Sequence, residues 1–165
     1  MTEEFFDIVD AADQPIGVAT RAYVHQAKLR HRAAHVLLYN RDGLLYLQRR
    51  SPLKDCSPGL WDTSAAGHLN QGEAYAVAAR RELFEELGIE PDDDLLNLYK
   101  LQADPATGYE FVEVFRTTTR RKVRPDPTEI AEGRWCTHAE VGEWIQRAPE
   151  EFTGTFRKIW GLLNP

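Results

Sequence analysis

The chain lacks a long apolar run and has little cysteine. A membrane-spanning helix needs about 20 predominantly apolar residues, and no stretch of the 165 residues comes near that length. The two cysteines, Cys56 and Cys136, are too few for a disulfide framework and do not form a paired metal motif. We expect both to be small, buried or half-buried residues. The first four residues do not begin a signal peptide, so we expect a cytoplasmic protein.

Internal repeats, low-complexity segments and an excess of positive charge are also missing. The formal net charge is −6 at pH 7, with 20 Lys and Arg against 26 Asp and Glu, which argues against an extended nucleic-acid surface. We therefore expect neither a nucleic-acid partner nor a membrane partner. Hydrophobic residues make up 42% of the chain, as in ordinary soluble proteins, and the length suits one domain with its own core. The sequence leaves open whether two copies form a homodimer.

Strand and helix patterns alternate along the chain. Apolar periodicity and turn residues predict an N-terminal hairpin extension within residues 1–30, a loop at 125–133, and one domain over residues 1–165. Further strands are expected at 31–40, 44–50, 61–66, 95–103, 109–117 and 134–136, and helices at about 71–87, 139–147 and 152–163. These elements predict an α/β sandwich around a mixed sheet, whose strand order the pattern does not fix.

Three glutamates fall on one face of the helix predicted before Gly88. At roughly 100° per residue, Glu82, Glu85 and Glu86 lie within about 100° of one another. They occupy the last turn, beside the negative end of the helix dipole, where like charges at these spacings repel. A divalent cation would resolve the conflict, because Mg²⁺ binds carboxylate oxygens. A solvated acidic face is the alternative, and from charge pattern alone it is the simpler one.

The same helix has a predicted core side and predicted ends. The spacing of Asn70 and Glu73 is that of a capping box, which places the helix start at 71–73. Gly88 is suited to the C-terminal end. The stripe expected to face the core consists of Ala76, Leu83, Phe84 and Leu87.

The spacing of residues 67–89 resembles the Nudix box. The pattern G-x5-E-x7-R-E-L-x-E-E-x-G-I is filled at every position, and a chance match at one site is roughly one in 10⁸. The chain is therefore identified as a member of the Nudix superfamily, which implies the Nudix α/β/α sandwich around a mixed β-sheet. The resemblance implies that Mg²⁺ or Mn²⁺ is held by Glu82, Glu85, Glu86 and the Gly67 carbonyl. Arg81 would orient the glutamates and Glu73 would hold Arg81, while Gly88 ends the helix.

The flanking segments resemble isopentenyl diphosphate isomerases, which share the Nudix fold, and the isomerase-like subgroup of Nudix hydrolases. Residues 31–68 carry the first resemblance and residues 7–25 the second. In the isomerases a catalytic cysteine precedes the glycine of the box, but here that position is Ala66. Alanine can neither donate nor accept a proton at carbon, and Cys56, ten residues upstream, is no obvious substitute.

The intact box and Ala66 together favour hydrolysis. We expect a metal-dependent Nudix diphosphatase that cleaves a diphosphate linkage in a nucleoside diphosphate or related X-linked diphosphate. The alternatives are an isopentenyl-diphosphate isomerase-like enzyme and a non-catalytic nucleotide-binding module. Each alternative predicts a small-molecule diphosphate ligand or nucleotide, and the sequence does not name the substrate.

Three histidines and a glutamate resemble a second metal site of the isomerases. His25, His31 and His68 match its histidine positions, with a one-residue gap at His25, and Glu110 matches one of its two glutamates. The other glutamate position falls near Gly108. Neutral imidazoles would favour Zn or Mn over Mg. Taken singly, each histidine is better explained as a hydrogen-bonded or surface residue.

Three cations follow the strand that leads towards the box. Arg49, Arg50 and Lys54 are expected to bind the diphosphate, and solvated edge charges are the alternative.

The catalytic set is expected to be Arg81 with Glu82, Glu85 and Glu86. Crowded carboxyl groups titrate together, so inspection does not assign the general base. The candidates for it are Glu85 first, then Glu110, Glu129 and Glu132.

Overall fold

A mixed sheet runs through the middle of the computed structural model, which describes residues 2–165. Its strands are β3 (His31–Tyr39), β4 (Leu45–Arg50), β5 (Trp61–Asp62), β6 (Ala65–His68), β7 (Leu96–Leu101), β8 (Glu110–Thr118) and β9 (Ile130–Cys136). The order is β5-β4-β3-β8-β7, with β6 paired to β3 and β9 paired to β4. Strands β3 and β8 run parallel, and the other pairs are antiparallel.

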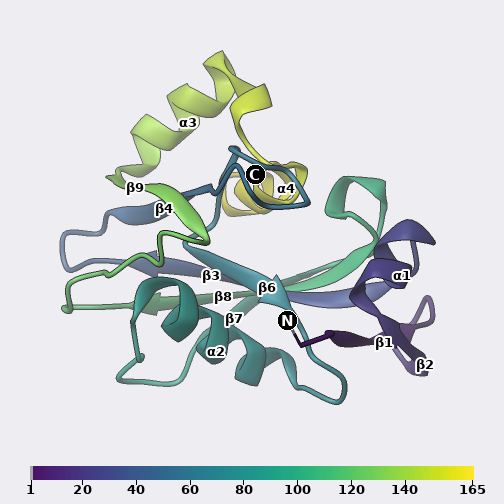
Figure 1. Ribbon diagram of the computed structural model, residues 1–165. Helices are drawn as coiled ribbons and strands as arrows, with labels where there is room; N and C mark the ends of the chain where they lie inside the picture. The colour runs from purple at the N-terminus through teal and green to yellow at the C-terminus, as the bar shows by residue number, and fades with distance from the viewer. Residues whose placement is uncertain (1) are drawn as a thin grey trace.

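Helices cover both faces of this sheet (Figure 1). Helix α2 (Tyr75–Leu87) lies on one face, and α3 (His138–Arg147) and α4 (Gly154–Leu163) lie on the other. Alternate residues of β3 supply the two cores: Ala34 packs in the cluster on the α2 side, and Leu37 in the cluster on the α3 and α4 side. A strand buried on both faces is expected to be continuously apolar, as β3 largely is. The predicted α/β/α sandwich around a mixed sheet is thereby confirmed.

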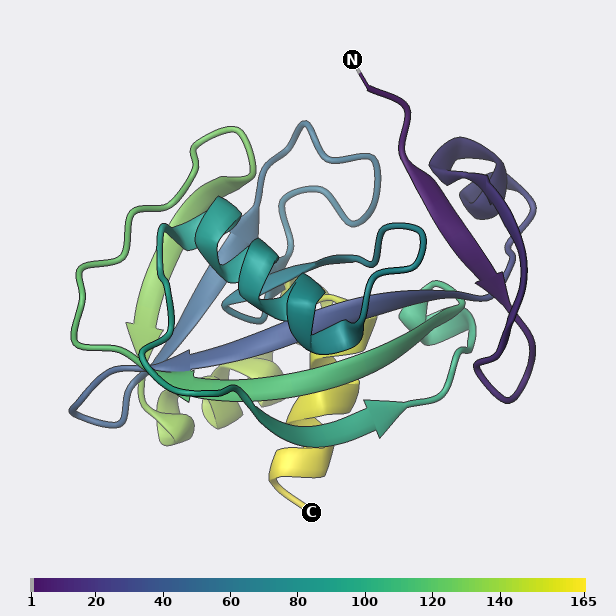
Figure 2. The ribbon, with the colours of Figure 1, turned by 90° about the horizontal axis from the view of Figure 1, so that it is seen from below.

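The N-terminal segment forms a separate two-stranded sheet beside the ends of β3 and β6 (Figure 2). Strands β1 (Phe5–Val9) and β2 (Pro15–Thr20) pair antiparallel, and helix α1 (Arg21–Gln26) follows. The Thr20 hydroxyl accepts a hydrogen bond from the Tyr23 amide and caps α1. This short helix places His25 beside His68 of the central sheet. Among residues 2–165, no helix is both long enough and apolar enough to cross a membrane.

Helix α2 differs from its prediction in start and in orientation. It begins at Tyr75, because residues 71–72 form a turn in which Gly72 is left-handed at φ 73°. The Glu73 carboxylate accepts from the Asn70 amide, as in a capping box, and also binds Arg81. Phe84 is 55% exposed and Ala76 is exposed, so the predicted core stripe is wrong at both. The buried positions are Ala78, Ala79, Leu83, Glu86 and Leu87. The helix is therefore turned so that a glutamate faces inwards.

Two strand predictions also need correction. Strand β9 starts at Ile130, inside the segment predicted as a loop, and pairs with β4 along its whole length. Its middle residues are exposed and polar, so they carry no apolar alternation. The segment predicted as one strand at 61–66 is divided between β5 and β6, because the chain crosses from β4 to β3 at Ser64. The Ser64 hydroxyl accepts from the Leu38 amide and donates to the Tyr46 carbonyl, which joins the two strands.

Candidate active site

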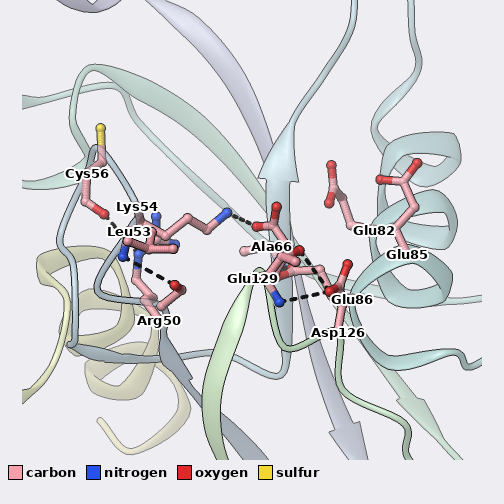
Figure 3. A network of polar contacts seen from close by, with 12 residues as sticks. Arg50, Leu53, Lys54, Cys56, Ala66, Glu82, Glu85, Glu86, Asp126 and Glu129 are labelled. Carbon is pink, nitrogen blue, oxygen red and sulfur yellow. Dashed lines mark hydrogen bonds and ion pairs between the residues drawn. The ribbon is translucent and has the colours of Figure 1, made fainter. Parts of the chain in front are cut away.

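Glutamates of the box project from α2 towards β6 and a cavity (Figure 3). Glu86 is 3% exposed. Its Oε1 accepts from the Ala66 amide at 2.7 Å, and its Oε2 accepts from the Gln48 side-chain amide at 3.2 Å. Glu85 is more open, with 56% of its side chain exposed. The box therefore presents one buried carboxylate with two hydrogen bonds and one largely exposed carboxylate to the same space.

Glu82 lies directly against Gly67. A Cβ at position 67 would overlap the Glu82 carboxylate, so the close approach requires glycine. Burial raises the pKa of Glu82 to about 7, and it raises the pKa of Glu86 to about 8. A bound divalent cation reverses this effect, because it stabilises the ionised carboxylates. Two crowded carboxyl groups that resist ionisation fit the predicted metal set, whose fourth member is the Gly67 carbonyl.

Arg81 orients the neighbouring carboxylates through hydrogen bonds. Its guanidinium donates to both oxygens of Glu73, at 2.8 and 2.9 Å, and to the His68 carbonyl at 3.0 Å. It also donates to Glu82 at 2.5 Å and to Glu85 at 3.2 Å. Hydrogen bonds to Glu73, acting against burial, raise the pKa of Arg81 above its usual range. This geometry supports the predicted roles of Arg81 and Glu73, and Gly88 ends the helix at φ 67°.

The predicted histidine set is brought together from four elements. His25 lies on α1, His31 on β3, His68 on β6 and Glu110 on β8, and one ligand atom of each lies within 4.8 Å of the others. His68 Nε2 is 3.3 Å from His25 Nε2 and 2.8 Å from Glu110 Oε1. Phe6 stacks on His31 and His68, which limits their movement. We call these four residues the histidine cluster.

The donor atoms of the histidine cluster fit a metal ion. The Nδ1–H of His31 donates to the Leu29 carbonyl at 2.8 Å, which leaves its Nε2 with a free lone pair. This Nε2 is buried, meets no hydrogen-bond partner at normal geometry among the described residues, and lies 3.5 Å from Glu110 Oε1. Burial lowers the pKa of His25 to about 4, and neighbouring histidines add to the effect. Contacts with His68 lower the pKa of Glu110 despite its burial. Neutral imidazoles beside an ionised carboxylate are the state that binds a cation.

A cavity of about 650 Å³ connects the box glutamates with the histidine cluster. Arg21, Arg50 and Lys54 line it, so a diphosphate between the two clusters would meet cations on one side. The Lys54 ammonium forms an ion pair with Glu129 (Figure 3). An incoming diphosphate would compete with Glu129 for Lys54.

Arg49 is not brought to this cavity. Successive strand residues point to opposite faces, and Arg49 lines a second hollow of about 490 Å³ beside Trp61 and Arg134. Its guanidinium is 3.8 Å from Glu132, which also lines the second hollow. The predictions of Arg49 as a diphosphate ligand and Glu132 as a base therefore fail on strand geometry. The other base candidates, Glu85, Glu110 and Glu129, do line the main cavity.

Several cavity residues were not identified from the sequence. His35 is 4% exposed and bonds to Thr63 Oγ1 at 2.8 Å, with Asp62 3.6 Å away. The signal available for His35 is that it interrupts the apolar run of β3. Asp126 reaches the cavity on the loop before β9, and its backbone amide bonds to the Glu86 carbonyl at 2.8 Å. A loop aspartate carries no comparable signal, because only the folded chain places it.

The two cysteines have different environments. Cys136 is buried, as expected, but Cys56 is exposed, so that prediction is wrong for Cys56. Its position follows from the loop between β4 and β5, where the Arg50 guanidinium donates to the Cys56 carbonyl at 3.1 Å. The Cys56 thiol lines the main cavity with its Sγ 4.0 Å from His25 Nδ1.

Relatives of known name match almost the whole chain. The isopentenyl-diphosphate Delta-isomerase 2 of Photorhabdus laumondii is 32% identical over 165 residues, covering 98% of this chain and 93% of that protein. The isopentenyl-diphosphate Delta-isomerase of Streptomyces griseus is 35% identical, covering 96% of this chain and 83% of that protein.

These relatives overturn the prediction of a diphosphate hydrolase and favour its isomerase alternative. The physical reason is that the carboxylates of the box suit cations and, through them, a diphosphate. Both chemistries need that binding, whether a P–O bond breaks or a double bond moves. An intact box therefore does not discriminate between them, and the prediction gave too much weight to the single position Ala66.

Solved structures and a family model agree with the fold. The crystal structure of DR0079 from Deinococcus radiodurans has a TM-score of 0.85 and 28% identity, covering 98% of this chain and all of that one. The NUDIX domain of Shewanella oneidensis NrtR, at 15% identity and a TM-score of 0.61, shares the fold over 78% of this chain and 82% of its own. The model of the NUDIX domain matches residues 29–155, which include the box and most of the histidine cluster. The chain belongs to the NUDIX domain family.

Proposed function

We propose that the chain is a metal-dependent enzyme that moves the double bond of a small alkenyl diphosphate of the isopentenyl type. The observation that carries the proposal is the histidine cluster, in which three imidazoles and the Glu110 carboxylate bring one ligand atom each to within 4.8 Å of the others, and His31 Nε2 is buried 3.5 Å from Glu110 Oε1. Phosphate binding alone does not require this second set of donors. Relatives that bear the isomerase name over nearly the full chain support the same reaction.

Two groups of residues would hold divalent cations. The carboxylates of the box suit Mg²⁺ or Mn²⁺, and the imidazoles of the histidine cluster suit Zn²⁺ or Mn²⁺. Bound cations offset the negative charge of a diphosphate. Arg50 and Lys54 would hold the diphosphate from the opposite wall of the cavity, with Arg21 near the histidine cluster. The alkenyl part would then lie over Ala66, which also lines the cavity.

The reaction needs two proton transfers at carbon. One terminal carbon gains a proton, the carbon two bonds away loses one, the double bond moves, and no atom is gained or lost overall. Ala66 lines the cavity but carries no exchangeable proton. The transfers therefore fall to other side chains of the cavity, and Glu110 is the first candidate because its carboxylate lines the cavity beside the histidine cluster. We expect a slower reaction than in an enzyme with a thiol at position 66.

The test is incubation of the protein with isopentenyl diphosphate and Mn²⁺ in deuterated water, followed by NMR. We expect the dimethylallyl isomer to form with deuterium in its new methyl group, and EDTA to stop the reaction. Ala66→Cys should restore a thiol beside the cavity and increase the rate. Release of phosphate without deuterium entering carbon, in both the wild type and Ala66→Cys, would contradict the proposal.

A further inference from the structure

A second group of metal-ligating side chains borders the histidine cluster. His25 Nδ1, Cys56 Sγ and a carboxylate oxygen of Asp55 all lie within 4.8 Å of one another. Cys56 Sγ is 4.0 Å from His25 Nδ1, and both Asp55 and Cys56 are exposed to solvent. We call these three residues the outer set. Thiolate, imidazole and carboxylate ligands with an open position are a combination that suits Zn²⁺ and other thiophilic cations.

The outer set is held in place by arginines from two directions. Arg21 Nη2 donates to both oxygens of Asp55, at 2.9 and 3.2 Å, and Arg21 Nη1 donates to Glu4 at 3.0 Å. An ionised carboxylate has about four acceptor positions, so Asp55 keeps positions for a cation. Carboxylates that bind metals are commonly fixed by such second-shell donors. Arg50 holds the Cys56 backbone carbonyl at 3.1 Å, which fixes the loop that carries the thiol.

His25 belongs to both groups but offers only one lone pair at a time. A neutral imidazole has one protonated nitrogen and one acceptor nitrogen. His25 Nε2 faces His68 Nε2 at 3.3 Å, inside the histidine cluster, whereas Nδ1 faces Cys56. The tautomer with a free Nε2 serves the histidine cluster, and the tautomer with a free Nδ1 serves the outer set. A neutral His25 therefore cannot ligate a cation in both groups.

We propose that His25, Asp55 and Cys56 form a separate binding site for a thiophilic divalent cation, in competition with the histidine cluster for His25. Binding exchanges the thiol proton of Cys56 for a metal–sulfur bond and releases the proton to solvent. Harder cations such as Mn²⁺ bind the histidine cluster with Glu110 instead, because thiolate ligands select soft cations. Which of the two sites binds a cation therefore depends on whether the cation present is soft or hard. The proposal does not require the isomerase reaction.

The first experiment is a Cd²⁺ titration of the reduced protein, followed by the ultraviolet charge-transfer absorption of cadmium–thiolate bonds. The matched variants are Cys56→Ser and Cys136→Ser, because Cys136 is the other cysteine and is buried away from the cavity. We expect the absorption in the wild type and in Cys136→Ser, and its loss in Cys56→Ser. Its absence in the wild type at full Cd²⁺ occupancy, or its survival in Cys56→Ser, would overturn the proposal.

A second experiment separates the outer set from the histidine cluster. Cd²⁺ or Zn²⁺ should slow alkylation of Cys56 by iodoacetamide by about 10-fold or more, since a bound thiolate is no longer a free nucleophile. Mn²⁺ should leave the rate unchanged. Asp55→Asn should remove most of the protection, whereas His68→Ala should keep it because His68 is not a member of the outer set. Protection that is lost in His68→Ala but kept in Asp55→Asn would place the cation in the histidine cluster and refute the outer site.

Discussion

The carboxylates of the box and the histidine cluster lie at two ends of the same cavity, but they come from the sequence in opposite ways. Glu82, Glu85 and Glu86 lie within two turns of one helix. The members of the histidine cluster come from α1, β3, β6 and β8. The residues of the first group are close together in the sequence. The second exists only after the hairpin, the parallel β3–β8 pair and the β6 crossover have formed.

Their electrostatics differ as well. The box crowds acidic groups, so burial raises the pKa of Glu82 and of Glu86. The histidine cluster mixes imidazoles with one carboxylate, so burial lowers the pKa of His25 while contact with His68 lowers that of Glu110. Without a cation, ionisation of the box carboxylates is therefore unfavourable. The histidine cluster, in contrast, already has hydrogen bonds among its own members. The two groups can therefore be disabled separately.

The largest effect is expected from Glu86→Gln. This variant keeps the size of the side chain but removes the buried negative charge that faces Ala66 and Gln48. We expect turnover and Mn²⁺ affinity of the box to fall by at least about 100-fold, since second-shell partners alone are commonly worth 10 to 100-fold. Calorimetric Mn²⁺ titration with a turnover assay measures both. Glu90→Gln, an exposed residue beyond the helix, is the matched control, and wild-type turnover in Glu86→Gln would contradict the assignment.

His68→Gln should disable the other end of the cavity. The substitution removes a ring nitrogen that faces both His25 and Glu110. We expect turnover to fall by about 100-fold and the Mn²⁺ affinity of the histidine cluster by about 10-fold or more, while Mn²⁺ binding at the box is retained. The control is His138→Gln, because His138 contacts Tyr39 away from the cavity. If His68→Gln and Glu86→Gln abolished the same single binding event, the division into two metal groups would be wrong.

A smaller effect should separate the two arginines at the end of β4. Arg50 lines the main cavity and Arg49 the second hollow. We expect Arg50→Gln to weaken binding of inorganic diphosphate by about 10-fold, the scale of one charge-assisted hydrogen bond, and Arg49→Gln to leave it unchanged. Isothermal titration in the presence of Mg²⁺ measures both. Equal losses in the two variants would show that the diphosphate does not lie in the main cavity.

The predictability of the site follows the same division. The helix that carries the box, its end at Gly88 and the facing carboxylates could be inferred from local periodicity and spacing. The helix start could not, because Gly72 takes a left-handed conformation that a helix cannot include. Arg49 was misplaced because two adjacent strand residues were treated as one group. Cys56 was misjudged because its exposure depends on how a loop folds against α1, which no local pattern records.

The fold was predicted well where strands are apolar and poorly where they are not. Strand β3 and the helices α3 and α4 lie close to their expected ranges. Strand β9 carries charged residues on an outer position of the sheet, so apolar alternation did not identify its first half. The parallel pairing of β3 with β8, which brings Glu110 beside His31, depends on contacts far apart in sequence. Only resemblance to a family pointed to that neighbourhood beforehand.

The smallest predicted effect is a pH dependence of stability that tells the two groups apart in EDTA. Glu82 and Glu86 have raised pKa values in the folded state, to about 7 and about 8. Above the usual glutamate pKa of 4.5 the folded state binds more protons than the unfolded state, so their contribution is complete below pH 4.5, falls as pH rises from there, and is fully lost above about 7 for Glu82 and about 8 for Glu86. His25 has a lowered pKa of about 4, so its contribution is complete above about pH 6.5 and is lost as pH falls.

Between pH 6.5 and 8.5 the carboxylates of the box should therefore lower the free energy of unfolding, each by about 1 kcal/mol per pH unit until the pH passes its folded-state pKa. Urea unfolding at several pH values in EDTA measures this slope. Glu86→Gln should flatten it, and His25→Asn should leave it unchanged while altering the slope between pH 4 and 6.5. Mn²⁺ should also flatten the upper slope, because the bound cation keeps the carboxylates ionised. A free energy of unfolding that rises from pH 6.5 to 8.5 in the metal-free wild type would mean that ionisation of the box carboxylates is not unfavourable. The contrast between the two ends of the cavity would then rest on geometry alone.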